Sequence, residues 1–328
     1  MSAPEFARID RFSRFFPLAR VPVGIGDDCA VLRPAAAAEL CVTTDALVEG
    51  VHFTRQHFSL ADVGHKALAV NLSDLAAMGA RPAWFLCALE LPPWLGDRQL
   101  DDLARGMSAL ARQHRIALVG GNLSRARSLS LTLTAAGEVP RGRALLRGGG
   151  RPGDRLYVSG TLGDARLGLA LLAQGRPGQA RSRQLRPTPR IALGLLARRF
   201  ASAAIDISDG LAQDAGHLAR ASRVRAVLEL DALPISPELE RHAGRAARVW
   251  AASGGEDYEL LLAVPPRAAS RFERACARAG ERVTWIGGLT RGRGVAVVDP
   301  QRGILPTPPG FDHFGARARQ IDRLSRRK

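Results

Sequence analysis

Lysine is almost absent from this chain of 328 residues, since Lys66 and Lys328 are the only two and every other basic residue is arginine. The 47 basic and 31 acidic side chains still give a formal net charge of +16. The arginines are scattered except at residues 316–328, and a basic run at a chain end is usually a solvated terminus. The composition therefore favours a general coding bias over a phosphate-binding face. No nucleic-acid partner is expected, and a nucleic-acid-binding protein is kept as the weaker alternative.

Cysteine is also scarce: Cys29, Cys41, Cys87 and Cys276 lie far apart and form no C-x-x-C pair. This spacing argues against a zinc site and against a disulfide framework, and leaves free thiols in a reducing compartment as the expectation. The chain also lacks an apolar run near the roughly 20 residues of a membrane span. Residues 1–5 lack the basic-then-apolar order of a signal peptide, so a cytoplasmic protein without a membrane partner is predicted.

Common catalytic and nucleotide-binding motifs are missing. There is no G-x-x-x-x-G-K-[ST] loop and no G-x-S-x-G elbow. Residues 148–153 match G-x-G-x-x-G but precede a predicted strand, so the context of a dinucleotide-binding helix is lacking. An ATP site in this chain would belong to neither common kind, and the sequence indicates no protein nucleophile.

Length and composition predict two globular domains. The chain is 46% hydrophobic and 24% charged, and domains of about 100–200 residues are typical. Periodicity disappears in an Arg- and Gly-rich stretch at residues 141–153. Strands and helices mix on both sides of it without strict βαβ alternation, which favours an α/β protein of the α+β type. The predicted parts are an N-terminal domain (1–140), a C-terminal domain (141–315) and a basic tail (316–328).

The expected elements follow hydrophobic periodicity and breaker residues. In the first half these are helices at 5–16, 62–78 and 97–114 and strands at 40–44, 84–91 and 128–139, with a short strand running into Gly120-Gly121. In the second half they are strands at 155–159, 203–207, 225–230, 258–264, 282–286 and 295–298, helices starting at 164, 190 and 209, and a loop at 175–189.

Aspartates in this basic chain gather beside glycines and at strand ends. They are Asp27, Asp28, Asp45, Asp74, Asp206, Asp209, Asp214 and Asp257. Any one of them alone reads as a helix cap or turn residue, as Asp62 and Asp209 do. Carboxylates brought together repel one another unless a cation lies between them, and Mg²⁺ prefers oxygen ligands together with substrate phosphates. The joint pattern therefore predicts a phosphate site with several magnesium ions.

Glycine-rich segments supply the other half of such a site, because bare backbone N–H groups can approach anionic oxygens closely. The candidates are Gly120-Gly121-Asn122 after a strand and residues 253–257 before one. His52 follows the Thr43-Thr44-Asp45 strand. A single histidine is usually structural, but the position of His52 beside the acidic site favours a functional role.

Taken together, these segments resemble the thiamine-monophosphate kinase family over nearly the whole chain. The motifs that carry the resemblance are GIGDDCAVL (24–32), TTDALVEGVHF (43–53), HKALAVNLSDLAAMGARPAW (65–84), GGN (120–122), LLRGGGRPGDRLYVSGTLGDA (145–165), RPTPR (186–190), DISDGLAQDAGHL (206–218), SGGEDYEL (253–260) and GFDHF (310–314). The family belongs to the aminoimidazole-ribonucleotide-synthetase-like ATP-binding enzymes. The resemblance implies a two-domain synthetase-like fold, with an N-terminal sheet that pairs across a homodimer and a C-terminal α/β domain.

The resemblance also implies site residues. Implied magnesium ligands are Asp28, Thr43, Thr44, Asp45, Asp74, Asn122, Asp206 and Asp209. Implied ATP contacts are Gly121, Asn122, Arg147 and Ser208, and implied contacts to thiamine monophosphate are His52, Glu256 and Phe311. The family usually carries aspartate where this chain has Asn122, whose amide oxygen can ligate magnesium but brings no charge.

The implied reaction is transfer of the ATP γ-phosphoryl group to thiamine monophosphate, the last step of thiamine diphosphate biosynthesis. The acceptor is already an anion, so positioning and charge cancellation are what the chemistry requires. Alternatives within the superfamily are a ring-closing or amide-activating synthetase and a selenophosphate synthetase, although the last needs a reactive cysteine near its N-terminus that is missing here. A catalytically weakened paralogue is a further alternative because of Asn122.

Overall fold

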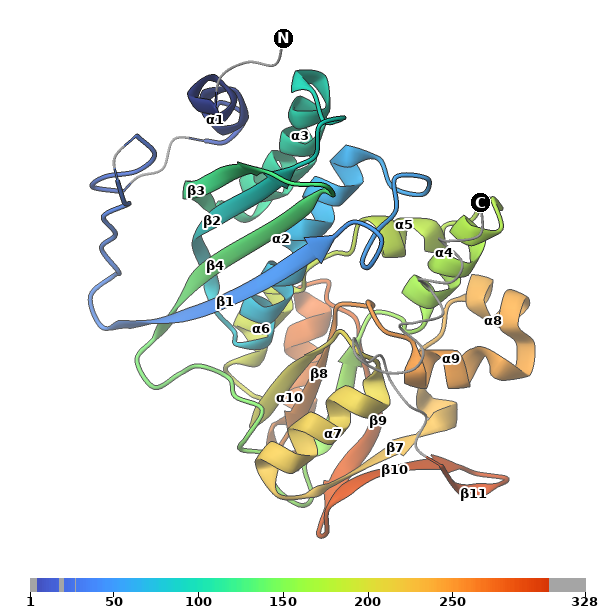
Figure 1. Cartoon of the computed structure of the whole chain (residues 1–328). Helices are drawn as coiled ribbons and strands as arrows, with labels where there is room; N and C mark the ends of the chain where they lie inside the picture. Colours follow the sequence, from blue (N-terminus) through green and yellow to red (C-terminus); the bar gives the residue numbers. More distant parts are fainter. Residues whose placement is uncertain (1–4, 18–20, 27, 307–328) are drawn as a thin grey trace. The chain divides into compact units, whose positions relative to one another are not determined.

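The computed structural model describes residues 5–17, 21–26 and 28–306. These residues form two compact units (Figure 1). Of the described residues, those before Ala76 together with Ala80–Gly142 form the first unit, and Ala76–Gly79 together with residues 143–306 form the second. The mixed α/β class and the two-domain organisation predicted from the sequence are confirmed.

The first unit is a four-stranded sheet with three helices. Its elements are α1 (Glu5–Ser13), β1 (Ala38–Val48), α2 (Leu60–Ala77), β2 (Arg81–Leu91), α3 (Asp97–His114), β3 (Ala117–Arg125) and β4 (Ser130–Pro140). The strand order is β1-β4-β2-β3, with β1 and β2 antiparallel to β4 and β2 parallel to β3. β1 and β3 both extend beyond the strands expected from the sequence, and β3 continues through Gly120-Gly121 instead of ending there.

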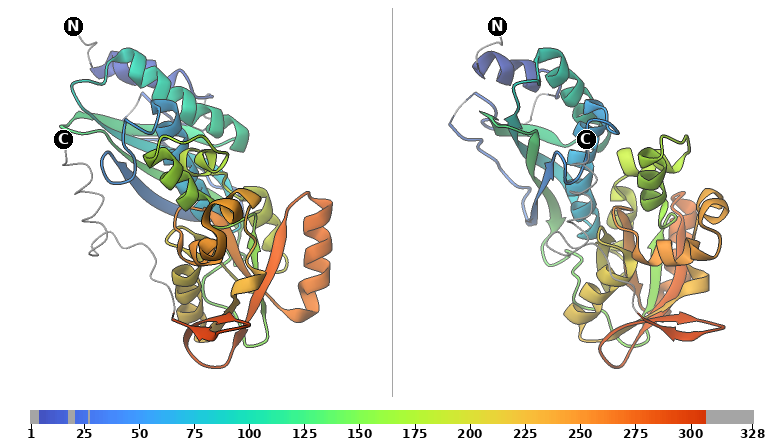
Figure 2. Two further views of the ribbon diagram at one scale, coloured as in Figure 1. Left: turned by 90° about the vertical axis from the view of Figure 1, so that its right-hand side faces the viewer. Right: turned by 45° about the vertical axis from the view of Figure 1, so that its right-hand side comes forward.

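Alternation along the strands gives this sheet two different faces. Leu47, Phe85, Leu89 and Leu133 are buried on one face of the sheet. Figure 2 shows α2 and α3 lying against one side of this sheet. Leu131 belongs to the same layer. On the opposite face Leu40, Val42 and Leu86 are exposed.

The two covering helices pack closely because glycines face the neighbouring backbone. A Cβ atom on Gly64 would lie 2.1 Å from the Leu103 carbonyl oxygen, and one on Gly106 would lie 1.8 Å from the Ala61 carbonyl oxygen. No larger residue fits at either position without moving a helix. This close packing brings α2 down onto the sheet, and α2 carries Asp74.

α2 begins with reciprocal hydrogen bonds between Ser59 and Asp62. The Asp62 amide donates to Ser59 Oγ over 3.2 Å, and the Ser59 amide donates to Asp62 Oδ2 over 3.2 Å. Ser59 is therefore the capping residue, and Asp62 completes a capping box from inside the first turn. The alternative of Asp62 as the cap itself was wrong by one turn.

The second unit surrounds a seven-stranded sheet of order β11-β10-β7-β9-β5-β8-β6. Its strands are β5 (Arg155–Ser159), β6 (Ala203–Ile207), β7 (Arg225–Glu229), β8 (Glu259–Val264), β9 (Val283–Thr290), β10 (Gly294–Asp299) and β11 (Gly303–Leu305). Its helices are α4 (Asp164–Ala173), α5 (Ala180–Leu185), α6 (Ile191–Ala197), α7 (Leu211–Ser222), α8 (Pro237–Ala243), α9 (Ala247–Ser253) and α10 (Pro266–Arg278), with 3-10 turns at Leu230–Ala232 and Gly244–Ala246.

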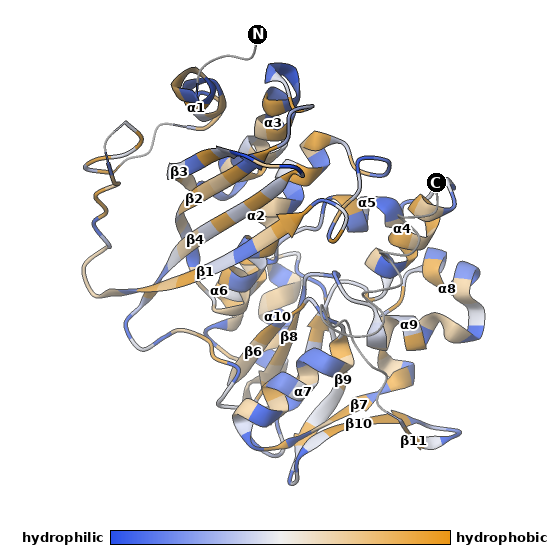
Figure 3. Cartoon of the chain, viewed as in Figure 1, coloured by the Kyte–Doolittle hydropathy of each residue, from blue (hydrophilic) through white to orange (hydrophobic). Residues whose placement is uncertain are grey.

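The core of this unit lies between the sheet and α7. Ile205, Leu211, Leu218 and Leu261 are all at most 2% exposed within one continuous cluster, and Figure 3 shows the hydrophobic colouring along β6 and β8. Burying a leucine or isoleucine side chain stabilises a fold by about 1.5–3 kcal/mol each, so this layer fixes where β6 and α7 meet. The junction between β6 and α7 carries Asp206 and Asp209.

Four helices of the second unit were not expected from the sequence: α5, α8, α9 and α10. α5 lies inside the predicted loop at 175–189, and α10 buries Ala268, Phe272 and Cys276 at helical spacing. Phe272 packs edge-on against Tyr157 with a centroid distance of 5.4 Å. Through the part of the chain that the structure describes, no helix combines the length and apolarity that crossing a bilayer requires.

Candidate functional site

In the first unit, Thr43, Asp45 and Asp74 come together between β1 and α2. Thr43 and Asp45 share one face of β1 because side chains two residues apart point the same way, and that face lies under α2. The Thr43 hydroxyl donates a hydrogen bond to Asp74 Oδ2. Burial and the neighbouring Asp74 carboxyl raise the pKa of Asp45 from 3.8 to about 7.

The chemistry of this donor set fits a divalent cation. Two carboxyl groups and a hydroxyl lie close together, and burial, together with the Asp74 carboxyl, disfavours the charged form of Asp45. A hard cation between such oxygens favours the deprotonated form and takes up the charge. Thr43, Asp45 and Asp74 are therefore suited to hold Mg²⁺.

The structure places the side chain of Thr44 on the opposite face of the sheet. Its hydroxyl donates to the Leu133 carbonyl over 3.0 Å and accepts from the Thr134 hydroxyl over 3.2 Å. Asn122 is exposed and pairs in register with Ala88, which alternates along β2 with the buried Cys87. The side chains of Thr44 and Asn122 therefore lie on the open face, not with Asp45.

Gly121 is required by the close approach of β2 and β3. A Cβ atom at this position would lie 2.0 Å from the carbonyl oxygen of Cys87, next to a bulge in the pairing between Phe85 and Leu86. No side chain fits there without separating the strands. The glycine leaves the β3 backbone bare at the point where the sequence analysis placed an ATP contact.

Asp28 and His52 lie at two loops of the first unit. Asp28 is exposed, in a loop whose ends pair through the Val23–Val31 bridge. His52 follows β1, and its Nδ1 accepts the Val48 backbone N–H over 3.0 Å. That hydrogen bond fixes the neutral ring with its proton on Nε2, so Nε2 is the donor end of the ring.

In the second unit, Asp214 organises the junction between β6 and α7. Its Oδ2 accepts the backbone N–H groups of Ser208, Asp209 and Gly210, each over 3.1 Å. Asp214 is 2% exposed, and burial and the neighbouring Asp209 raise its pKa to about 7. The expectation that Asp209 caps this helix was wrong: Gly210 is the capping residue, and the three amides are satisfied by Asp214 instead.

Asp209 lies beside a second acidic group and a histidine, and its Oδ2 accepts a hydrogen bond from Gln213 Nε2 over 3.1 Å. Ligand atoms of Asp209, Asp214 and His217 all lie within 4.8 Å of one another. Burial and the positive charges of Arg220 and Arg147 lower the pKa of His217. Asp214 was predicted only as one of the aspartates retained in this basic chain, and no role was predicted for His217. Their i, i+3 spacing on one helix face is the signal that could have found both.

Glu256 lies against the same junction. Its backbone N–H donates to the Ser208 carbonyl over 2.7 Å, and its Oε2 accepts from Gln184 Nε2 over 2.5 Å. Ser208, Asp209 and Glu256 are thus brought together from two separate motifs, and Asp206 is buried at the end of β6. Phe311 and the tail at 316–328 lie outside the described residues.

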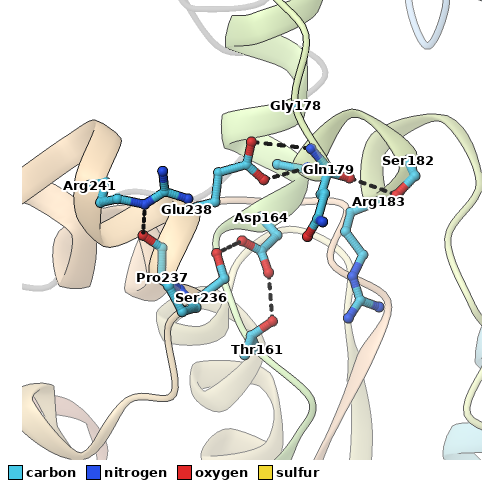
Figure 4. Close-up of a pocket in the computed structure, with 11 residues that line it drawn as sticks. Thr161, Asp164, Gly178, Gln179, Ser182, Arg183, Ser236, Pro237, Glu238 and Arg241 are labelled. Atoms are coloured by element: carbon cyan, nitrogen blue, oxygen red, sulfur yellow. Dashed lines mark hydrogen bonds between the residues drawn. The ribbon is translucent and has the colours of Figure 1, made fainter.

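A polar cavity of 630 Å³ opens elsewhere in the second unit, between α4, α5 and α8 (Figure 4). Its acidic groups are already satisfied internally. Asp164 accepts from Thr161 and Ser236 over 2.5 Å each, and Glu238 accepts the backbone N–H groups of Gln179 and Ala180. These contacts give the cavity wall a structural role.

Both halves of the chain match models of one superfamily. Residues 26–139 match "AIR synthase related protein, N-terminal domain" and residues 151–300 match "AIR synthase related protein, C-terminal domain". The thiamine-monophosphate kinase of Salmonella typhimurium strain LT2 is 42% identical over 330 residues, covering 96% of this chain and 99% of that protein. The Escherichia coli strain K12 enzyme of the same name is 42% identical over 326 residues, with the same coverage of both chains.

The chain belongs to the thiamine-monophosphate kinase family. Solved structures of the family agree with this. The thiamine-monophosphate kinase of Stenotrophomonas maltophilia K279a superposes with a TM-score of 0.83 at 46% identity, covering 90% of this chain and 97% of that one. "AaThiL complexed with AMPPCP and TMP" superposes with a TM-score of 0.76 at 35% identity, covering 94% and 97%. Escherichia coli HypE, at 22% identity and a TM-score of 0.78, shares the fold.

Proposed function

We propose that this chain transfers the γ-phosphoryl group of ATP to the phosphate of thiamine monophosphate, with the help of several Mg²⁺ ions. The products are thiamine diphosphate and ADP, so the reaction is the last step of thiamine diphosphate biosynthesis. The observation that carries the proposal is the convergence of Thr43, Asp45 and Asp74 in a chain of this family. ATP, magnesium and the substrate are cytoplasmic solutes, and the reaction is placed in the cytoplasm.

The transfer is proposed to be direct and in line. The acceptor phosphate is an anion at neutral pH and needs no protein base, and no protein nucleophile is assigned. The remaining problem is the repulsion between two polyanions, which positioning and opposite charge overcome. Bound Mg²⁺ supplies that positive charge and orients the phosphates.

The proposed ligands of Mg²⁺ are divided between the two units. In the first unit they are Asp28, Thr43, Thr44, Asp45, Asp74 and Asn122, and in the second Asp206 and Asp209. Because the side chain of Thr44 hydrogen-bonds on the open face of the sheet, its backbone carbonyl is the oxygen proposed to act. Asn122 contributes an amide oxygen without charge, so the metal position it serves is proposed to bind more weakly than one with aspartate.

Further residues are proposed to contact the two substrates directly. Gly121, Asn122, Arg147 and Ser208 are proposed to contact ATP, and His52, Glu256 and Phe311 to contact thiamine monophosphate. Glu256 suits this role because thiamine carries a cationic thiazolium ring and an aminopyrimidine donor, both of which a carboxylate attracts.

We also propose a homodimer formed through the open face of the first sheet. Leu40, Val42 and Leu86 are 40%, 58% and 37% exposed there, and exposed apolar residues grouped on one sheet face are typical of an interaction surface. The domain bounds proposed for this enzyme are 1–140 and 141–315, followed by the basic tail at 316–328.

Label transfer from ATP tests the proposed reaction. With γ-labelled ATP, thiamine monophosphate and Mg²⁺, the label is expected in thiamine diphosphate, with one ADP formed for each labelled product. ATP consumption with ring-closing or amide-forming synthetase substrates in place of thiamine monophosphate would contradict the proposal. A labelled protein formed from ATP alone would contradict the direct transfer.

A further inference from the structure

Residues 256–258 form a turn in which two of three successive positions have a left-handed backbone. Glu256 has φ +66° and Tyr258 has φ +50°, values that residues other than glycine rarely adopt. Arg115 and Arg223 share this conformation, but they directly follow α3 and α7, where it is common. The 256–258 turn leads into β8 and ends no helix. Its strain therefore persists only because the surrounding groups hold it, and such positions gather at functional sites.

Backbone contacts with the end of β6 hold one side of this turn. The Glu256 N–H donates to the Ser208 carbonyl over 2.7 Å, and the Tyr258 N–H donates to the Ile207 carbonyl over 2.9 Å. A Cβ atom on Gly255 would lie 2.7 Å from the same Ser208 oxygen. Because no side chain fits at Gly255 unless the two segments separate, the turn lies directly on the end of β6.

The side chain of Asp257 holds the turn from a second element, α4. Its Oδ2 accepts the Gly163 N–H over 2.7 Å, and its Oδ1 accepts the Ala165 N–H over 3.2 Å. N–H groups at the start of a helix have no partner within that helix, so they need an acceptor from outside. Since Asp257 lies between the two left-handed residues, these hydrogen bonds fix the turn at its centre.

The start of α4 is itself held in the core of the second unit. Gly163 has φ +81°, and a Cβ atom there would lie 2.9 Å from the backbone nitrogen of Ala251 and 2.9 Å from Leu239 Cδ2. Ala251 and Leu239 are both fully buried, as is Leu167 one turn further along α4. The hydrogen bonds of Asp257 therefore tie the turn to a part of the structure that is fixed by packing.

Capping of α4 alone does not account for this arrangement. α8 is capped from its own segment, because the Ser236 hydroxyl accepts the Leu239 N–H over 3.0 Å. α4 instead has Gly163 at its capping position, without a side-chain acceptor, and Asp257 reaches it from a segment 94 residues away. A local serine or aspartate would cap α4 without a strained turn. The strained turn is therefore a feature that the capping of α4 does not require.

We propose that Asp257 is a positioning residue that holds the 256–258 turn in its strained conformation for the binding of thiamine monophosphate. This rests on the proposed contact of Glu256 with that substrate. Asp257 acts through the backbone, since both of its carboxylate oxygens accept N–H groups of α4. It sets the position of the Glu256 main chain, whichever groups the Glu256 side chain contacts.

Asp257→Asn tests the positioning role. The amide turns a donor toward one of the two N–H groups, so one hydrogen bond is lost while the size of the side chain is kept. The KM for thiamine monophosphate is expected to rise about tenfold, while kcat at saturation and the KM for ATP stay within about twofold. Equal rises in both KM values, or no rise in either, would overturn the proposal.

Asp154→Asn is the matched control, because Asp154 is also a buried carboxylate that accepts a backbone N–H. Its Oδ2 accepts the Arg151 N–H over 2.9 Å and the Ser202 hydroxyl over 2.5 Å. Asp154 and Ser202 directly precede β5 and β6, whereas the turn lies at the other end of β6. Asp154→Asn is expected to lower the melting temperature and to leave both KM values unchanged. A rise in the KM for thiamine monophosphate as large as that of Asp257→Asn would overturn the proposal.

The strain at residue 256 is tested by comparing Glu256→Gly with Glu256→Ala. Both variants lack the carboxylate, but only glycine adopts a positive φ without cost. Glu256→Gly is expected to melt about 3 °C above Glu256→Ala. At Glu240, an exposed position within α8, the order should be reversed because glycine destabilises a helix. A Glu256→Gly variant that melts at or below Glu256→Ala would overturn the proposal.

Hydrogen exchange in the wild type keeps the test decisive if Asp257→Asn folds poorly. A ligand that binds only the held turn makes its opening rarer. Thiamine monophosphate at ten times its Kd is expected to slow exchange of the Gly163 and Ala165 amides about tenfold. The Arg151 amide, which Asp154 accepts, should keep its rate. Unchanged exchange at Gly163 and Ala165, or equal slowing at all three amides, would overturn the proposal.

Glu256→Ala separates this proposal from the proposed function. If it raises the KM for thiamine monophosphate and Asp257→Asn does not, the site assignment stands and the positioning role of Asp257 is wrong. If only Asp257→Asn raises that KM, the turn positions the substrate and the assignment of the Glu256 side chain is wrong. A wild type that forms no labelled thiamine diphosphate would instead refute the proposed reaction.

Discussion

Asp45 is expected to affect both the stability of the protein and the proposed binding of Mg²⁺. Its pKa is raised from 3.8 to about 7, first by burial and then by Asp74. Between these two pH values the folded state holds a proton that the unfolded chain has released, so the free energy of unfolding falls as the pH rises. Mg²⁺ binds the deprotonated carboxylate and is expected to restore that stability.

Asp45→Asn is predicted to flatten this pH dependence. In EDTA the melting temperature of the wild type should fall between pH 5 and pH 8, and the variant should fall less because its amide does not titrate. Asp214, whose pKa is also about 7, leaves part of the slope in place. The comparison is made by thermal unfolding at several pH values with and without Mg²⁺.

Asp102→Asn is the control for this series. Asp102 pairs with Arg105 on α3, where the two side chains are 43% and 54% exposed, and its variant should keep the slope of the wild type. A slope that is the same in Asp45→Asn and in the wild type would contradict the coupling of Asp45 with Asp74.

At the residue scale, the sequence predicted the grouping of Thr43, Asp45 and Asp74 but not the direction of every side chain. Strand alternation alone puts the side chains of Thr43 and Asp45 on one face of β1 and that of Thr44 on the other. Which of these faces α2 covers depends on tertiary packing, such as that between Gly64 and Leu103. The role of Asp214 was hidden for a similar reason. Its three hydrogen bonds go to backbone amides, and a sequence motif does not display backbone partners.

At the scale of elements, the turn between β6 and α7 depends on Asp214. It satisfies three amides at the start of the helix, a set of donors that would otherwise be buried without partners. Asp214→Ala is predicted to cost about 3 kcal/mol in the free energy of unfolding, because each unsatisfied buried donor costs about 1–3 kcal/mol and water recovers part of it.

Asp214→Asn is predicted to cost only about 1 kcal/mol, since an amide oxygen still accepts while the charge is lost. Urea unfolding of the two variants against the wild type measures both values. Equal and small losses in the two variants would indicate that these amides do not depend on the side chain of residue 214.

Long helices with a regular spacing of apolar residues were predicted more accurately than short ones. α3 was predicted to the residue, because 18 residues carry a continuous apolar stripe. α5 has six residues, and the backbone N–H groups of Gln179 and Ala180 at its start donate to the Glu238 carboxylate from a distant segment. A helix that is stabilised by a contact 58 residues away leaves little local pattern. α10 did carry such a pattern, in Ala268, Phe272 and Cys276, and it was overlooked.

At the scale of the whole molecule, the proposed dimer accounts for the open face of the first sheet. Val42→Arg places a charge where Val42 is 58% exposed, and a charge within a dimer interface is expected to separate the subunits. The wild type should elute at twice the mass of the chain and the variant at the mass of one chain, by light scattering after size exclusion.

Ile304→Arg is the matched control, since Ile304 is 72% exposed on β11 in the second unit. It should leave the mass unchanged. A wild-type protein that elutes as a single chain, or a Val42→Arg variant that remains a dimer, would contradict the assignment of this face.

The net charge of +16 belongs to the whole molecule and does not describe the candidate site. The groups that converge at the candidate site are acidic, and the scattered arginines surround a protein whose proposed substrates are polyanions. The role left to the arginines is to raise the rate at which ATP and thiamine monophosphate reach the protein, an effect that salt screens.

Phosphorylation of thiamine monophosphate by ATP is proposed to depend on the cluster of Thr43, Asp45 and Asp74. The measurement that tests it most directly is the appearance of label in thiamine diphosphate from γ-labelled ATP, in the wild type and in Asp45→Asn, across a Mg²⁺ titration. Mg²⁺-dependent labelling is expected from the wild type, and a loss of at least about a hundredfold is expected in the variant. Labelling that is independent of Mg²⁺, or equal in the two proteins, would contradict it.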